Sequence, residues 1–227
     1  MSTPKPNAAL PWLTRAAHGS SAFLAIFLAI HLSAPALANL GGASLASQVM
    51  LLGREYYQAP IGEPSLLLAP LALHAAASTA KRLLSPRPVR LLTLTGYATL
   101  LVFAPIHFIT HRLNPSFAGA PIHAVGPAEL DYEFVKVGLH AWPWRSALLY
   151  AGLVGCTVLH AAEGVNIILT TYFRKRWSAK TRRIAAALCA VPVLTGVLTL
   201  VMEPLMALSS VAARYHASFT RSYIFRL

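Results

Sequence analysis

The clearest indication of the fold class is residues Ser146 to Phe173, SALLYAGLVGCTVLHAAEGVNIILTTYF. It carries one charged residue, Glu163, and one histidine, His160. A helix needs about 20 mostly apolar residues to cross the hydrocarbon core of a bilayer. This stretch therefore predicts a membrane-spanning helix, and the basic run RKRWSAKTRR follows it directly.

Four further stretches are long and apolar enough for the same reading. We predict an all-α fold, a polytopic membrane helix bundle of five spans, between an N-terminal tail at 1–15 and a C-terminal tail at 209–227. The spans are expected at 16–37, 65–80, 91–110, 146–173 and 184–208. Segments 46–57 and 129–140 are expected to form short helices at the membrane interface. Prolines within or near the spans predict kinks.

The composition agrees with a membrane protein and excludes several other classes. Of 227 residues, 56% are apolar and 11% are charged, whereas about 25% are charged in a typical globular protein. The two cysteines, Cys156 and Cys189, lie in apolar stretches, which excludes a disulfide scaffold. The sequence has no nucleophile elbow, phosphate loop or HExxH motif, so we expect no catalytic residues. A basic chain this apolar favours a membrane protein with basic loops, so we expect no nucleic-acid partner. The first apolar run is too long for a signal peptide.

The net charge of +12 reports on orientation. With five spans, the N-terminal side of the membrane holds twelve basic residues and no acidic one. These are Lys5, Arg15, Lys81, Arg82, Arg87, Arg90, Arg174, Lys175, Arg176, Lys180, Arg182 and Arg183. The other side mixes seven basic residues with five acidic ones. The positive-inside rule therefore predicts a cytosolic N-terminus.

Four histidines fall inside the first four spans: His31, His74, His107 and His160. Ionisable residues inside spans are costly and are candidates for function. His31 lies 16 residues after Arg15, and His107 lies 17 after Arg90, so both sit roughly 25 Å from the N-terminal side. His74 and His160 lie 7 and 14 residues before the next basic residue, or roughly 10 and 20 Å. The first pair matches well in depth and the second less well.

Two stacked histidine pairs from alternate helices are the arrangement that bis-histidyl b-type haems require. We therefore expect two haem b groups in a core made by the first four spans, with axial pairs His31/His107 and His74/His160. Small residues such as Ala34, Gly96 and Gly164 leave room for a flat macrocycle. The expected partners of the haem propionates are His111 and Arg112 at one end, and Lys81, Arg82, Ser20 or Ser21 at the other.

Other interpretations of these residues stay open. The four histidines would also be explained by hydrogen bonds between helices, or by a histidine-lined transporter or channel without cofactor. Zinc or copper is less favoured, because only His160 has a carboxylate near it in sequence. That residue, Glu163, is either a hydrogen-bond partner of the His160 site or a neutral acid bonded to a neighbouring helix.

The chain also resembles two known groups of proteins. The order of histidine phrases is similar to that in the di-haem cytochrome b anchors of succinate dehydrogenase and fumarate reductase. The closer resemblance is to the fungal Mdm-ten-complementing protein family of the mitochondrial outer membrane, from Phe23 to about Arg176. It is carried by Ala29–His31, Gly53–Tyr57, Leu73–Ser78, Thr95–Tyr97, Ile106–His107 and His160–Gly164.

This resemblance implies a non-enzymatic role in mitochondrial lipid homeostasis. It implies that the protein receives or scrambles phospholipids, delivered by a bridge-like lipid-transfer protein of the vacuolar protein sorting 13 kind. The family recruits that partner through a Pro-x-Pro segment, for which the candidates here are Pro4–Pro6 and Pro86–Pro88. Polar candidates for a scrambling groove are Ser20, Ser21, Asn166, Thr170 and Thr171. Association with a second copy of the chain is a further candidate interaction. The alternative function is a di-haem redox subunit that passes electrons from quinol to a partner chain.

Overall fold

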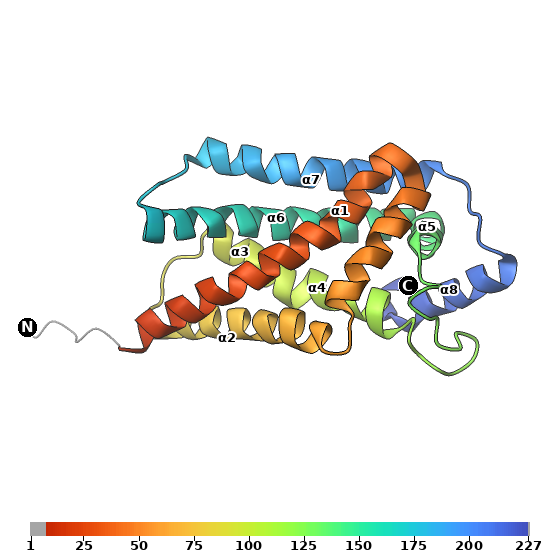
Figure 1. The fold of residues 1–227 in the computed structure, drawn as a ribbon, viewed down its shortest axis with the longest axis horizontal. Helices are drawn as coiled ribbons and strands as arrows, with labels where there is room; N and C mark the ends of the chain where they lie inside the picture. Colours follow the sequence, from red (N-terminus) through yellow and green to blue (C-terminus); the bar gives the residue numbers. More distant parts are fainter. Residues whose placement is uncertain (1–7, 227) are drawn as a thin grey trace, which may run out of the picture. The chain divides into compact units, whose positions relative to one another are not determined.

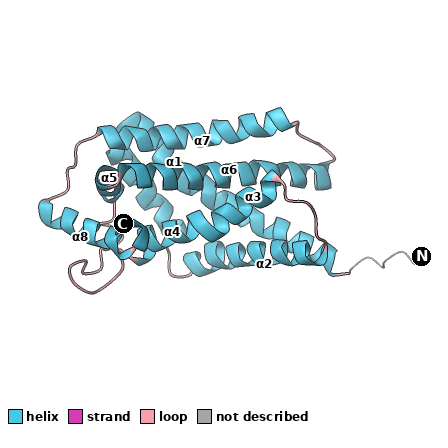
Figure 2. Cartoon of the chain, turned by 180° about the vertical axis from the view of Figure 1, so that it is seen from behind, coloured by secondary structure: helices cyan, strands magenta, loops and turns pink. Residues whose placement is uncertain are grey.

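The computed structural model describes residues 8–226, and the secondary structure within that range is helical, without strands (Figures 1 and 2). The chain divides into two compact units, each described by itself. The first comprises the described residues up to Ile30 together with Gly53–Arg90, and the second comprises His31–Leu52 together with Leu91 onwards. The all-α prediction is confirmed.

Within residues 8–226, four helical segments are long and apolar enough to cross a membrane: Ala9–Tyr57, Leu91–Leu113, Pro143–Phe173 and Ala179–Met202. They correspond to the first, third, fourth and fifth predicted spans. Their apolar side chains are largely exposed, for example Leu101 at 68% and Leu188 at 71%. Large exposed apolar surface of this kind suits contact with lipid rather than with water. These helices support a multi-span membrane protein.

Helix α1, Ala9–Tyr57, is longer than the predicted span and has a break within it. Pro35 lies inside the helix, yet the non-helical residues are Gly41 and Gly42. Gly42 has φ of 60° and ψ of −155°, a conformation open essentially only to glycine. The break divides α1 into a first arm, up to Leu40, and a second arm, from Ala43 to Tyr57. The second arm contains the helix predicted at 46–57.

In the first unit, the π-helical turns of η1, Glu63–Leu68, continue directly into α2, Ala69–Leu84. Pro64 and Pro70 are among these residues, and the N–H that each lacks is consistent with the wider turns. Together η1 and α2 cover the predicted second span, and 22 helical residues would extend roughly 33 Å. That this segment crosses the membrane stays a prediction. The end of α1 lies against an earlier part of the same helix: the rings of Phe27 and Tyr57 meet edge to face, with their centroids 5.3 Å apart.

In the second unit, one continuous helical segment is built from α3 (Leu91–Ala98), η2 (Thr99–Phe103), α4 (Ala104–Phe108) and η3 (Ile109–Leu113). The π-helical turns η2 and η3 lie on either side of Pro105, which lacks a backbone donor. This segment packs along α6, Pro143–Phe173. Helix α7, Ala179–Met202, lies beside α6 in Figure 1.

The predicted end of the last span, at residue 208, is wrong. Helix α7 ends at Met202, and Glu203 has extended dihedral angles of φ −85° and ψ 142°. The reason is Pro204, because the ring of a proline disfavours helical geometry in the residue before it. Residues 203–208 instead form an irregular connection to α8, Ser209–Arg221.

Helices α5, Tyr132–Ala141, and α8 pack together beside the start of α6, with the short helix η4, Tyr223–Phe225. Asp131 caps α5 by accepting a hydrogen bond from the Glu133 amide at 2.9 Å. The shared core of this region is Ile122, Val125, Leu130, Phe134, Val137, Tyr215, Phe219 and Phe225. The C-terminal segment, predicted only as a tail, therefore supplies a helix to a packed region that also contains the helix predicted at 129–140.

Candidate functional site

The structure brings together His31 of α1 and His107 of α4, both in the second unit. Their ring centroids are 5.8 Å apart and the ring planes are nearly perpendicular, at 81°. The two histidines with the best predicted match in depth thus lie close together in the structure.

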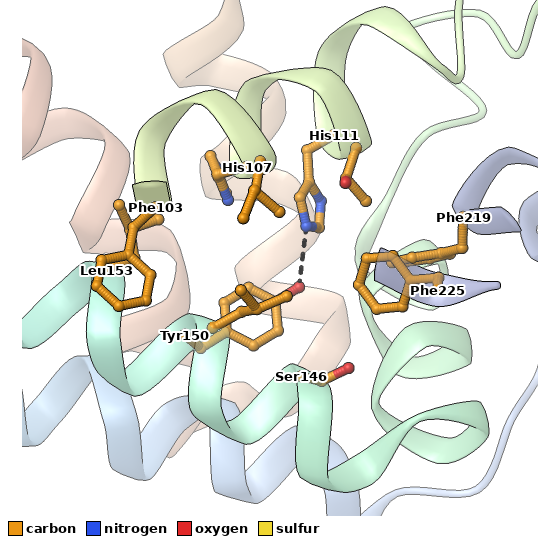
Figure 3. Close-up of a pocket in the computed structure, with 11 residues that line it drawn as sticks. Phe103, His107, His111, Ser146, Tyr150, Leu153, Phe219 and Phe225 are labelled. Carbon is orange, nitrogen blue, oxygen red and sulfur yellow. Dashed lines mark hydrogen bonds between the residues drawn. The ribbon is translucent and has the colours of Figure 1, made fainter. Parts of the chain in front are cut away.

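His111 extends this pair into a row of rings. It stacks on His107 with a centroid distance of 4.5 Å, and its Nε2 atom lies 3.2 Å from the hydroxyl of Tyr150 (Figure 3). Phe134 and Phe219 meet the same ring edge to face. His111 is therefore set among aromatic side chains. Arg112, the other expected propionate partner, donates a hydrogen bond to Ser116 at 3.1 Å.

A cavity of about 20 Å³ lies beside His107 and His111 (Figure 3). This volume is enough for roughly one water molecule. Its lining is Phe103, Ile106, His107, Thr110, His111, Ser146, Leu149, Tyr150, Leu153, Phe219 and Phe225. His31 and His107 are of the residue type that ligates haem iron, while the cavity beside His107 is far smaller than a macrocycle. Binding would therefore require the surrounding side chains to move apart.

His74 of α2 lies in the first unit, with its Nδ1 atom 2.9 Å from the carbonyl oxygen of Ala17. A carbonyl oxygen can only accept, so Nδ1 donates and the lone pair of the ring sits on Nε2. The hydroxyl of Ser20 lies 3.5 Å from the same nitrogen. A backbone carbonyl that fixes the tautomer in this way is usual behind a metal-ligating histidine.

His160 of α6 lies in the second unit and makes the same kind of bond. Its Nδ1 atom donates to the carbonyl oxygen of Leu92 at 2.9 Å, which again places the lone pair on Nε2. Gly96 packs against the ring, since a Cβ atom there would lie 2.7 Å from it. Because His74 and His160 belong to different units, their pairing stays a prediction.

Glu163 forms an ion pair with a neighbouring helix. Its Oε1 atom accepts a hydrogen bond from Arg182 Nε of α7 at 2.7 Å. Of the two interpretations left open by the sequence, contact with a neighbouring helix is the one seen, and the partner is the cation Arg182. The Nδ1 atom of His160 itself bonds to the Leu92 carbonyl oxygen.

The remaining polar candidates mostly bond within their own helices. Ser20 donates to Ala16 at 2.7 Å and Ser21 to His18 at 2.7 Å. Thr170 and Thr171 donate to carbonyl oxygens one turn earlier. Of the two Pro-x-Pro segments, Pro4–Pro6 lies outside the described residues, and Pro86–Pro88 is exposed in the non-helical connection between α2 and α3.

The sequence alone did not predict a buried polar cluster around Lys136 of α5. This lysine is 1% exposed, and its Nζ atom lies 2.5 Å from Glu133 and 3.4 Å from Glu203. The other oxygen of Glu203 accepts from the Ala43 amide at 2.9 Å, where the second arm of α1 begins. The spacing of Glu133 and Lys136 was visible in the sequence, but Glu203 is distant and was placed inside a predicted span.

Glu133 also holds the connection after α7, because its Oε2 atom accepts from the amides of Met206, at 2.8 Å, and Ala207, at 3.1 Å. Burial alone raises the pKa of Glu133, but hydrogen bonds from Lys136 and from the Met206 amide outweigh it and hold the pKa below its ordinary value. The cluster therefore ties together α5, the α7–α8 connection and α1.

This lowered pKa predicts how stability depends on pH. A carboxyl with a lower pKa in the folded state stabilises the protein above its unfolded pKa, and that contribution is lost as the pH falls through the folded pKa. We expect the unfolding temperature in detergent to fall as the pH drops from neutral to below about 4.5. Glu133→Gln should flatten this fall, whereas Glu55→Gln, which removes an exposed carboxylate, should leave it unchanged. An equal slope in native protein and Glu133→Gln would contradict the assignment.

Comparisons with protein families, with characterised proteins and with solved structures found no match to this chain. The resemblances drawn from its sequence phrases therefore stay predictions.

Proposed function

We propose that the protein binds b-type haem within a five-span membrane domain and acts in lipid homeostasis of the mitochondrial outer membrane. The observation that carries the haem part is the approach of His31 and His107, two histidines from different helices inside candidate spans. The fifth span would be the η1–α2 segment, whose length is sufficient. Support for the lipid part comes from the sequence phrases shared with the Mdm-ten-complementing protein family.

His31 and His107 would hold one haem as axial ligands, and His74 and His160 would hold a second. A bound haem supplies one-electron chemistry at its iron. The chain's own contribution is orientation: the carbonyl oxygens of Ala17 and Leu92 fix the tautomers of His74 and His160, and Tyr150 hydrogen-bonds to His111 beside the other pair. These bonds favour imidazole rings held in one orientation.

The lipid role consists of receiving or scrambling phospholipids that a bridge-like lipid-transfer protein delivers. The N-terminus would face the cytosol, since the side rich in basic residues is the cytosolic one. The exposed Pro86–Pro88 segment lies on that same side. It is the candidate for recruiting the partner within residues 8–226. A self-associated form of the chain is compatible with this role.

The optical spectrum of the purified protein tests the haem proposal. We expect a Soret band and a pyridine haemochrome, with about two haems per chain. His31→Ala and His107→Ala should each remove about half of the haem, and combining either with His74→Ala should remove the rest. His216→Ala is the matched control, because His216 is exposed and stacks on Trp142. Absence of the Soret band in native protein, or an intact spectrum in every variant, would reject the proposal.

Liposomes containing the protein test the lipid role separately. Labelled phospholipid should equilibrate between the two leaflets faster than in protein-free liposomes of the same composition. No acceleration would count against scrambling without touching the haem assignment. Rapid reduction of bound haem by a quinol would favour the alternative function, a redox subunit that passes electrons to a partner chain.

A further inference from the structure

A group of exposed cations lies in the turn between α6 and α7 and in the beginning of α7. No Asp or Glu occurs between residues 164 and 202. Arg182, the half-buried cation of the turn, is neutralised by Glu163 at 2.7 Å. The other cations are all exposed, and we call them the turn cations: Arg174, Lys175, Arg176, Lys180 and Arg183. Lys180 and Arg183 share one face of α7, since residues three apart are neighbours on a helix.

Hydrogen bonds hold the turn in one shape. The Trp177 amide donates to Asn166 Oδ1 at 2.8 Å, and its carbonyl oxygen accepts from Arg182 at 2.7 Å. The Thr170 hydroxyl lies within hydrogen-bonding distance of the Lys175 carbonyl oxygen, at 3.2 Å. A backbone fixed in this way sets the spacing of the turn cations in advance, which lowers the entropy lost when they bind a ligand.

The turn between α6 and α7 is placed at the membrane surface by the two helices that it joins. Helices α6 and α7 are both candidate spans, so the short turn that joins them lies at one face of the membrane. Tyr172 and Phe173, 54% and 64% exposed, immediately precede it. Aromatic side chains of membrane proteins concentrate at the level of the lipid headgroups. The turn cations are therefore placed at the depth of lipid phosphates.

We propose that the turn cations bind the phosphate groups of anionic phospholipids in preference to zwitterionic ones. A basic side chain close to an anionic membrane surface contributes about 1 kcal/mol, or about fivefold in affinity. A zwitterionic headgroup carries its own cation, which cancels this attraction. The inference rests on the proposed lipid role for its biological meaning, while its physical basis is the α6–α7 turn alone.

Spin-labelled lipids in reconstituted bilayers measure this preference directly. In phosphatidylcholine liposomes, we compare the association constants of two spin-labelled lipids with native protein, taken from the immobilised fraction of each. The constant for phosphatidylglycerol should be at least about fivefold that for phosphatidylcholine. Replacing the five turn cations by glutamine should bring the ratio to within about twofold of unity. High salt should also reduce the native ratio, because exposed charges are screened.

The control variant removes two exposed basic residues from the other basic loop, Arg87→Gln and Arg90→Gln, and is matched to the double variant Lys175→Gln/Arg176→Gln. It should keep most of the native preference, since our proposal assigns binding to the α6–α7 turn rather than to total positive charge. The double variant Lys175→Gln/Arg176→Gln should give an intermediate ratio. It replaces the variant with five substitutions as the test if that variant fails to fold. No preference in native protein, or an equal loss in the control, would overturn the proposal.

The same liposomes separate this inference from the proposed function. Scrambling without a preference for phosphatidylglycerol would reject the inference alone. A preference without scrambling would support the inference and reject the scrambling role.

Discussion

Replacing Gly196 by alanine should destabilise the protein by about 3 kcal/mol or more. A Cβ atom at this position of α7 would lie 1.7 Å from the carbonyl oxygen of Pro35 and 2.8 Å from its carbonyl carbon, in the first arm of α1. Both are backbone atoms, so no side-chain rotation can relieve the clash and the helices must separate. Separation would also break the bond from Asn39 Nδ2 to the Pro192 carbonyl oxygen, which is 2.7 Å long.

Thermal unfolding in detergent, followed by tryptophan fluorescence, measures this effect. Gly164→Ala is the matched control, because a Cβ atom there would meet no atom within 4 Å. Alanine is the better helix former by about 1 kcal/mol, so the control should be unchanged or slightly more stable. Equal unfolding temperatures for the two variants would show that α1 and α7 do not make this contact.

Replacing Lys136 by methionine should cost about 3 to 5 kcal/mol. Methionine fills a similar volume but removes the positive charge that lies 2.5 Å from Glu133 and 3.4 Å from Glu203. Two carboxylates would then share a largely enclosed site without a cation, and removing one partner of a buried ion pair leaves the other uncompensated.

The size of the effect is checked by unfolding experiments and by a rescue. Arg87→Met removes an exposed cation and should change stability by no more than about 0.5 kcal/mol. Adding Glu133→Gln and Glu203→Gln to Lys136→Met should recover part of the loss, since residues in one network are coupled. A triple variant as unstable as the sum of its single variants would show that the three side chains act independently.

The positions of the helices could be predicted from the sequence because their signal is local. An apolar run such as Ser146–Phe173 satisfies its backbone groups internally in any apolar surrounding, so length and hydropathy are sufficient to place a helix. The predictions that were wrong concern where helices end and where they break. Pro204, included in the last span, ends α7 at Met202 instead, and α1 breaks at Gly41 and Gly42 rather than at Pro35.

The candidate site could be predicted in part. Counting residues at a fixed rise per residue placed His31 and His107 at one depth, and their rings lie 5.8 Å apart. The same counting could not place the hydrogen-bond partners. The sequence left two interpretations of Glu163, a partner of the His160 site or an acid bonded to a neighbouring helix. The structure pairs it with Arg182 of the next helix, because the direction in which a side chain points depends on which helix packs beside it.

Local patterns in the sequence were enough to predict helices, several of them long and apolar enough to span a membrane, with histidines inside them, since each of these properties follows from residues close together in the chain. Contacts between distant segments became visible only in the folded chain. Lys136 forms an ion pair with Glu203, which is 67 residues away, and Gly196 packs against the backbone of Pro35. Such contacts depend on the crossing and register of helices, which are set by packing between distant segments rather than by any local pattern.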